Sequence, residues 1–198
     1  MYVHEYMQTK LVTVTPETLI EDAEKLMNDF NIRRLPVLED GRLMGVVTKH
    51  HLKRLELTGP SKVKQVMVRD PVTVTPDMMI SDVALLGQDR KIGTFPVVDH
   101  GKLVGILTAT DIFKIQAEAL GFGKAGMRLH VYDCCGGWQL RNVLEIALAH
   151  KANLLGLYRV TSPATERAET ILFLDTVEGP ELLDDLRARG YVVEARFR

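Results

Sequence analysis

The chain has 198 residues, of which 46% are apolar and 26% charged, and its formal net charge is −1. This balance is typical of a globular protein with a buried core, and it lacks the excess of basic residues that marks a nucleic-acid or anionic-membrane surface. No apolar run approaches the roughly 18–20 residues that span a bilayer, and the N-terminal residues lack a secretory signal pattern. The two cysteines, Cys134 and Cys135, are adjacent and close no useful loop, so we expect a cytoplasmic protein with reduced thiols.

An internal repeat dominates the first part of the chain. The segment Val-Thr-Val-Thr-Pro at 12–16 recurs at 72–76, a shift of 60 positions (72 − 12). The same shift continues without a gap as far as Thr48 and Thr108. Shared composition does not produce such a match, so we expect two copies of one fold unit, at residues 1–60 and 61–120.

Each copy predicts the same order of elements. In the first copy, residues 12–14 predict a strand, and Thr15-Pro16 predicts a helix start with Thr as N-cap and Pro at the first helical position. Apolar spacing gives that helix one buried face as far as Phe30, and Asn31 suits a left-handed cap. Residues 35–38 and 43–48 predict a hairpin around Asp40-Gly41. A second helix follows over about 49–57, and its counterpart lies over about 109–120.

Several short motifs occur in both copies. They are the Thr-Pro entry, the strands Leu35-Pro36-Val37 and Phe95-Pro96-Val97, and the Gly-x-Leu-x-Gly return after each hairpin. With the Thr-x-x-Asp at 108–111, they resemble the CBS domain family over about residues 1–118, and the pair resembles a Bateman module. The resemblance implies an α+β fold in which two β-α-β-β-α units pack about a pseudo-two-fold axis. It also implies a cleft for an adenine nucleotide of the AMP, ADP or ATP type as a regulatory ligand, with a cyclic dinucleotide and S-adenosylmethionine as alternatives.

Thr108 and Asp111 lie where a strand ends and a helix begins. One interpretation is a capping box, in which the acid reaches back to the helix N-terminus. The resemblance implies another, in which Asp111 accepts hydrogen bonds from the ribose hydroxyls and Thr108 favours the phosphate. The first copy has His51 in place of the acid, and an imidazole cannot accept two diol protons. We therefore expect nucleotide at the Asp111 site, and the second cleft to be empty or to bind another ligand.

Two arginines, Arg33 and Arg34, precede a strand of the first copy, where the second copy has Gly93-Thr94. On their own they are typical of a solvated surface. The resemblance implies that they reach the phosphates of a nucleotide that the other copy's acid holds. His50 lies near the same point of the chain and is a weaker candidate.

The segment 61–67 leads into the second copy. The resemblance implies that Ser61 supplies a hydroxyl to the nucleotide and that Val63 and Val66 form an apolar wall for adenine. The alternative is a linker strand with core valines.

The remaining chain predicts a third domain. Residues 121–126 are glycine-rich and predict a linker. Residues 127–198 predict the order β-α-β-β-α-β, a ferredoxin-like layout. With Ala152-Asn153-Leu154 this stretch resembles the ACT domain, a module that often binds amino acids, and the resemblance implies Asp133 and Asn153 as ligand residues. The first loop departs from the family pattern, so a pure dimer element is the alternative.

A CBS pair followed by an ACT-like domain resembles acetoin-utilisation regulatory proteins. We expect a homodimeric ligand sensor that signals through dimer or domain rearrangement to a possible protein partner, with no nucleic-acid or membrane contact. The alternatives are a scaffold with empty clefts or an amino-acid sensor that uses the ACT-like domain. The sequence has no Gly-x-Ser-x-Gly, P-loop or paired-carboxylate pattern, so we expect neither an enzyme nor a catalytic cofactor. Cys134, Cys135 and His130 do not have zinc-site spacing, so we expect no metal.

Overall fold

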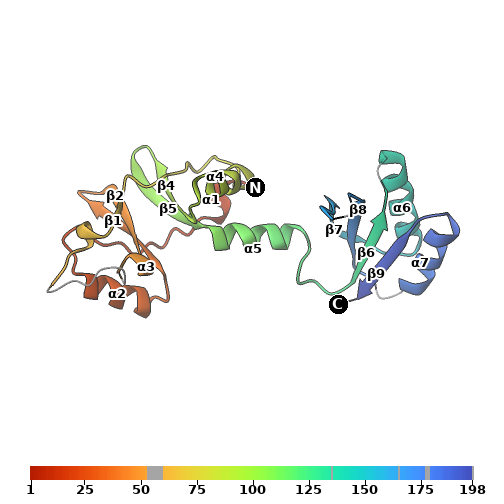
Figure 1. Ribbon diagram of the computed structural model, residues 1–198, viewed down its shortest axis with the longest axis horizontal. Helices are drawn as coiled ribbons and strands as arrows, with labels where there is room; N and C mark the ends of the chain where they lie inside the picture. The colour runs from red at the N-terminus through yellow and green to blue at the C-terminus, as the bar shows by residue number, and fades with distance from the viewer. Residues whose placement is uncertain (53–59, 135, 165, 177–178, 198) are drawn as a thin grey trace. The chain divides into compact units, whose positions relative to one another are not determined.

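The computed structural model describes residues 1–52, 60–134, 136–164, 166–176 and 179–197. The chain divides into two compact units, Met1–Phe113 and Lys114–Arg198 (Figure 1). Each unit has a hydrophobic core of its own.

The first unit contains both copies of the repeat. The first copy has α2 (Ile20–Asp29), β1 (Arg34–Glu39), β2 (Arg42–Thr48) and α3 (Lys49–Leu52), and the second has α4 (Ile80–Arg90), β4 (Thr94–Asp99), β5 (Lys102–Thr108) and α5 (Ala109–Ala119). The predicted hairpins are present, with Asp40 at φ 49° and Gly41 at φ 77° in the first turn. Asn31 has the predicted left-handed conformation, at φ 50°. The part of the second helix that was predicted over 53–57 lies outside the described residues.

The prediction that Thr15-Pro16 starts a helix was wrong. The helices begin at Ile20 and Ile80, and residues 12–14 form only an isolated bridge, from Val14 to Val37, within the described chain. The reason is that each helix N-terminus is satisfied by backbone from elsewhere. Ile20 N donates to the Ser61 carbonyl at 2.9 Å, and Ile80 N donates to the Met1 carbonyl at 3.1 Å. A first helical N–H that already has a backbone partner does not need a threonine cap.

The segment that precedes each copy joins the sheet of the other copy. β3 (Val68–Arg69) precedes the second copy and pairs antiparallel with β2 of the first. In the equivalent place, Gln8 forms a bridge with Ile106 of β5, and its N–H donates to the Ile106 carbonyl at 2.9 Å. Two short helices belong to these segments, α1 (Val3–Tyr6) and the 3₁₀ turn η1 (Val63–Gln65). The two copies are thus interlocked by an exchange of segments.

The close approach of these exchanged segments depends on two equivalent glycines. A Cβ on Gly45 would lie 2.6 Å from the Val68 carbonyl oxygen, and a Cβ on Gly105 would lie 2.5 Å from Met7 Sδ. Real Cβ atoms do not approach other atoms so closely, so a side chain at either position would force the exchanged segment to shift.

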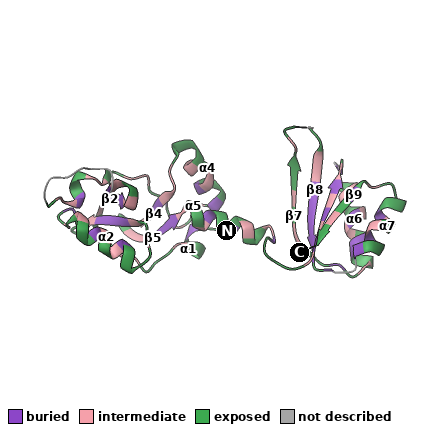
Figure 2. Ribbon diagram, turned by 60° about the horizontal axis from the view of Figure 1, so that its bottom comes forward, coloured by how far each residue is buried: buried purple, intermediate pink, exposed green. Residues whose placement is uncertain are grey.

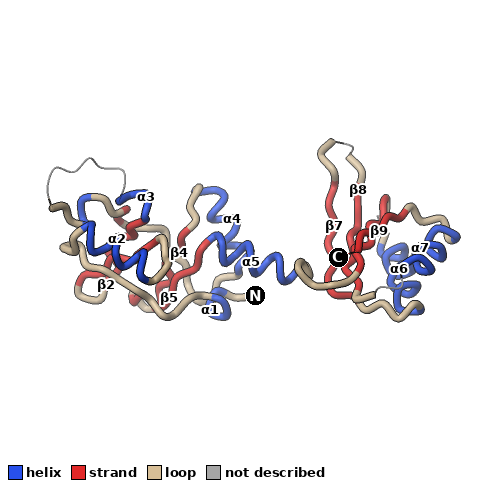
Figure 3. The backbone as a smooth tube through the Cα atoms, turned by 90° about the horizontal axis from the view of Figure 1, so that it is seen from below, coloured by secondary structure: helices blue, strands red, loops and turns tan. Residues whose placement is uncertain are grey.

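The second unit has the predicted β-α-β-β-α-β order. Its elements are β6 (Met127–Tyr132), α6 (Gly137–Ala149), β7 (Leu154–Thr161), β8 (Ala168–Leu174), α7 (Gly179–Ala188) and β9 (Val193–Phe197). The sheet is antiparallel with the order β7-β8-β6-β9. Both helices lie on the same side of it (Figures 1 and 3).

Burial in this unit follows the sheet order. β6 alternates buried and half-buried residues, so one of its faces packs under α6 and α7. Leu129, Leu172 and Leu182 are fully buried there. The edge strand β7 is mostly exposed, in contrast to β8 beside it (Figure 2).

Within the described residues, no helix combines the length and the apolar character that a membrane span requires.

Candidate functional site

A pocket of about 400 Å³ lies where the two copies meet in the first unit. We call it the interrepeat pocket. Its walls come from the segments 8–12, 31–36 and 106–111. It therefore combines the entry to β1, the end of β5, the start of α5 and the N-terminal segment that the exchange places against β5. The predicted residues Arg33, Arg34, Thr108 and Asp111 all line it.

Asp111 forms the capping box with Thr108. Its Oδ2 accepts hydrogen bonds from Thr108 N at 2.9 Å and from Thr108 Oγ1 at 2.6 Å, and Asp111 N donates to Thr108 Oγ1 at 3.3 Å. The other oxygen, Oδ1, accepts a longer bond from Gln8 Nε2 at 3.3 Å. The capping bonds thus use Oδ2, whereas Oδ1 accepts only the longer bond from Gln8 among the hydrogen bonds of the described residues.

Cations outnumber the acid in this pocket. Lys10, Arg33 and Arg34 line it together with Asp111. Arg33 is exposed, whereas Arg34 is half-buried. Burial lowers the pKa of Arg34, and the neighbouring Arg33 lowers it further, while Asp111 opposes the shift. Arginine stays charged in proteins, so this arrangement holds positive charge at an incompletely solvated position that favours an anionic group.

A second pocket, of about 350 Å³, is lined by residues that the repeat makes equivalent. We call it the companion pocket. Val46, Val68, Pro71, Val72 and Ile92 give it largely apolar walls.

His51 occupies the position of the acid in the companion pocket. Thr48 N donates to His51 Nδ1 at 3.3 Å, and His51 N donates to Thr48 Oγ1 at 3.3 Å. The imidazole thus takes over the capping role of Asp111, and the carboxylate that lines this pocket is that of Asp70. Among the described residues, Arg34 is the one that lines both pockets.

The structure places the other predicted residues elsewhere. Val63 is fully buried in the core of the first copy, Val66 packs against that core, and the Ser61 carbonyl bonds the start of α2. His50 is exposed and lines neither pocket. Ser61, Val63 and Val66 lie away from the interrepeat pocket because the segment exchange carries residues 61–69 to the first copy.

Sequence reasoning missed the residues that take the expected place of segment 61–67. These are Gln8, Lys10, Leu11 and Val12, which line the interrepeat pocket. The repeat contains the relevant signal, since the shift of 60 positions pairs Gln8 with Val68 and Val12 with Val72. Which copy each segment joins in space is not visible in that alignment.

The two residues that were predicted for a ligand in the third domain are not brought together. Asp133 lines a groove beside α6 and accepts hydrogen bonds from Arg167 Nη2 at 2.8 Å and Nε at 3.2 Å. Asn153 does not line that groove. Its N–H and side-chain amide donate to Asp175 at 2.7 Å and 3.0 Å, and these bonds lower the pKa of Asp175.

Across the described ranges, no group of three histidine, cysteine or acidic side chains could hold a metal ion. Cys135, a residue of the adjacent cysteine pair, lies outside those ranges.

Relatives of known sequence match the repeated region. The inosine-5'-monophosphate dehydrogenase of Korarchaeum cryptofilum is 36% identical over 122 residues, which are 61% of this chain and 25% of that relative. The chain therefore spans only a small part of that enzyme. The CBS domain-containing protein YhcV of Bacillus subtilis is 33% identical over 128 residues, which are 62% of this chain and 91% of YhcV.

Solved structures match a similar share of the chain. CBSX2 in complex with AMP has a TM-score of 0.54 at 30% identity, covering 58% of this chain and 95% of that one. The CBS domain pair of MJ0100, in complex with methylthioadenosine and S-adenosyl-L-methionine, has a TM-score of 0.55 at 27% identity, covering 59% and 96%. AcuB of Vibrio cholerae, whose name links it to acetoin utilization, has a TM-score of 0.55 at 28% identity, covering 61% and 93%.

The family model for the CBS domain matches this chain twice, at residues 3–57 and 63–118. These two matches coincide with the two interlocked copies that form the interrepeat pocket. The chain belongs to the CBS domain family and contains a tandem CBS pair.

Proposed function

We propose that this chain senses an adenine nucleotide in the interrepeat pocket and transmits its occupancy through a dimer or domain rearrangement. The observation that carries the proposal is the convergence of one carboxylate from the second copy and two arginines from the first on a single pocket of about 400 Å³. Asp111 would accept from the ribose hydroxyls, and Arg33 and Arg34 would hold the phosphate. A pocket of this volume is within the range of small-molecule sites, roughly 300–1,000 Å³.

The comparisons support this choice of ligand. One similar structure contains AMP, and another contains two adenosine derivatives, one of them a sulfonium without phosphate. Three cations around one acid favour the phosphate-bearing ligand here, because a sulfonium would add positive charge to a pocket that already has an excess of it.

The proposal extends to the second unit and to assembly. The β-α-β-β-α-β order and the sheet order β7-β8-β6-β9 support an ACT-like domain there. We place the protein in the cytoplasm, where adenine nucleotides are abundant, as a homodimer that regulates a partner protein. The fact that relatives such as YhcV are built of CBS domains alone supports a regulatory role without catalysis.

Calorimetric titration with AMP and with adenosine tests the nucleotide proposal. We expect AMP to bind more tightly, because adenosine lacks the phosphate that the arginines would hold. Arg33→Gln changes an exposed residue, so the fold is preserved, and it should weaken AMP binding roughly 10- to 100-fold, as expected for a hydrogen bond to a charged group. Its effect on adenosine should be much smaller.

The acid has a matched control in the other copy. Asp111→Ala removes a side chain that accepts from Thr108 N at the start of α5, and His51→Ala removes the equivalent acceptor for Thr48 N at the start of α3. Of the two residues, Asp111 lines the interrepeat pocket and His51 lines the companion pocket. We expect both variants to lose a similar amount of stability, about 1 kcal/mol. Only Asp111→Ala should abolish AMP binding. Equal AMP affinity in the two variants, or no binding of any adenine ligand to the wild type, would contradict the proposed function and favour a scaffold.

A further inference from the structure

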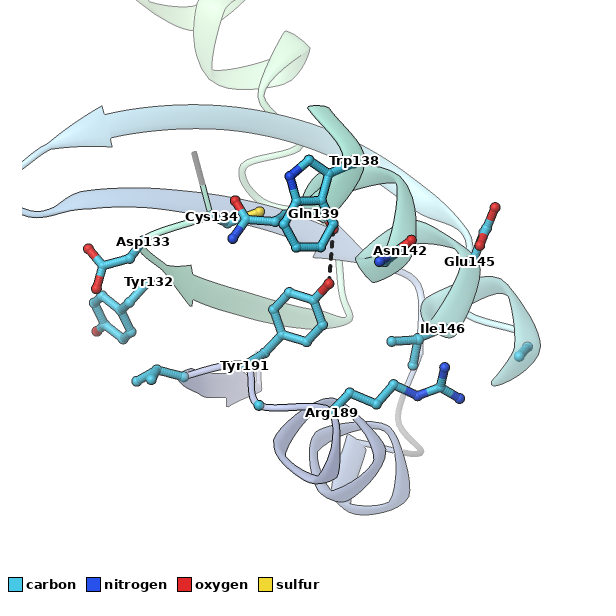
Figure 4. A pocket seen from close by; sticks show the side chains of 13 residues that line it. Tyr132, Asp133, Cys134, Trp138, Gln139, Asn142, Glu145, Ile146, Arg189 and Tyr191 are labelled. Atoms are coloured by element: carbon cyan, nitrogen blue, oxygen red, sulfur yellow. Dashed lines mark hydrogen bonds between the residues drawn. The ribbon is translucent and has the colours of Figure 1, made fainter. Parts of the chain in front are cut away.

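One pocket of the second unit has no role in the nucleotide proposal. It is a groove of about 530 Å³ between the end of β6, one side of α6 and the connection from α7 to β9 (Figure 4). We call it the α6 groove. Its volume is sufficient for a small organic molecule.

One stripe of α6 forms the upper wall of the groove. Trp138, Asn142, Glu145 and Ala149 recur at spacings of three and four residues, so they share one side of the helix. This side is distinct from the core side, on which Val143 is fully buried. α6 therefore has a second organised face besides the one that packs on the sheet.

The opposite wall is Tyr191, which follows a left-handed glycine. Gly190 has φ 85°, a conformation that lets the chain turn sharply from α7 into β9. The Tyr191 hydroxyl reaches the carbonyl of Gln139 at 3.5 Å, the long contact that Figure 4 marks across the groove.

Trp138 is the single tryptophan of the chain and is 67% exposed. The indole lies close to the backbone of Gly136, since a Cβ on that glycine would lie 3.0 Å from the indole Nε1. Figure 4 shows Trp138 at the groove, on the side of α6. A large aromatic side chain with an exposed surface offers a platform on which a ring can stack.

The charged residues of the groove are already paired with residues beside it. Glu145 accepts from Arg141 Nε at 2.7 Å, and Arg189 Nε donates to Asp185 at 2.9 Å. Asn142 differs, because its amide has no hydrogen-bond partner in the part of the chain that the structure describes. The groove therefore presents an exposed aromatic surface and, one helical turn away, the Asn142 amide.

We propose that the α6 groove binds a planar heterocycle with a hydrogen-bond donor and acceptor side by side on its edge, as on a purine base. The ring would stack on Trp138, and its edge would pair with the Asn142 amide, which offers a donor and an acceptor together. This site lies within the second unit and shares no lining residue with the interrepeat pocket.

Titration of tryptophan fluorescence with free adenine and free hypoxanthine tests this site. Trp138 is the only tryptophan, so a saturable change reports the second unit and not the interrepeat pocket. N-acetyltryptophanamide corrects for absorption by the base. We expect a saturable change in the wild type and an affinity about tenfold lower in Asn142→Ala, which keeps the fluorophore.

Leu148→Ala is the matched control, because Leu148 lies on the same helix, is 62% exposed and does not line the groove. Near-ultraviolet circular dichroism verifies that each variant is folded. Absence of a saturable change with either base would overturn the site. Equal losses in Asn142→Ala and Leu148→Ala would overturn the role of the amide. A response to free serine or isoleucine without any response to the bases would overturn the ligand class.

Discussion

The two glycines at the segment exchange allow a quantitative test of the interlocked fold. A Cβ on Gly45 would meet the Val68 carbonyl oxygen at 2.6 Å, whereas ordinary contact begins at 3.4 Å, so Gly45→Ala requires a separation of 0.8 Å (3.4 − 2.6). The obstacle is backbone, which is held by the pairing of β3 with β2. We expect Gly45→Ala to destabilise the first unit by about 1–3 kcal/mol, as for other overpacked positions.

The equivalent change in the second copy meets a side chain instead. A Cβ on Gly105 would lie 2.5 Å from Met7 Sδ, and a methionine can rotate away from it. Gly105→Ala should therefore cost less than Gly45→Ala. Met7→Ala should restore most of the loss in Gly105→Ala, whereas Met67→Ala should not rescue Gly45→Ala, because the Val68 carbonyl remains in place.

Urea denaturation followed by far-ultraviolet circular dichroism measures these differences. Trp138 fluorescence follows the second unit, whose transition should not move. Equal losses in the two glycine variants, or full rescue of Gly45→Ala by Met67→Ala, would refute the argument that backbone contact distinguishes the two positions.

Two further predictions concern charge and backbone conformation. Lys62 and Lys64, in the exchanged segment, lower the pKa of Glu17 from its ordinary 4.5 to about 2. The stabilisation that accompanies this lowered pKa is fully present above the unfolded-state pKa of 4.5 and is lost as the pH falls towards about 2. The small difference in stability between the wild type and Glu17→Gln should therefore shrink over this pH range, and also with added salt. A difference that is constant over this range would contradict the pairing. Gly190→Ala meets no atom within 4 Å, yet it places a side chain at φ 85°, so it should destabilise the second unit by about 1–2 kcal/mol in denaturation followed by Trp138 fluorescence. An unchanged midpoint would show that the turn tolerates alanine.

Local patterns predicted most of the elements correctly. The hairpins at Asp40-Gly41 and at Gly101, the helix α6 and the order of elements along the second unit all follow from turn residues and periodicity over short stretches. Such signals are contained in neighbouring residues, so they can be seen without the fold.

The errors occurred where distant backbone decides the outcome. Thr15-Pro16 has the appearance of a helix start, but Ile20 finds its partner in the Ser61 carbonyl. For Val63 the sequence left two alternatives, the pocket wall and the core, and the residue lies in the core because its segment crosses to the other copy's sheet. The prediction that Arg34 and Asp111 line one pocket could be made from the sequence. The first copy has the arginines and lacks the acid, whereas the second copy has the acid and lacks the arginines.

The position of Arg34 has a consequence for how the CBS pair responds to more than one ligand. Its guanidinium lies in the wall of both pockets, and its Nη2 is 3.7 Å from where a Cβ on Gly93 would stand. A bound phosphate that draws this group towards Asp111 leaves the His51 side with less positive charge. For an anionic ligand of the companion pocket, thermodynamic linkage requires the reverse effect to have the same size, so each anion would weaken the binding of the other without touching it.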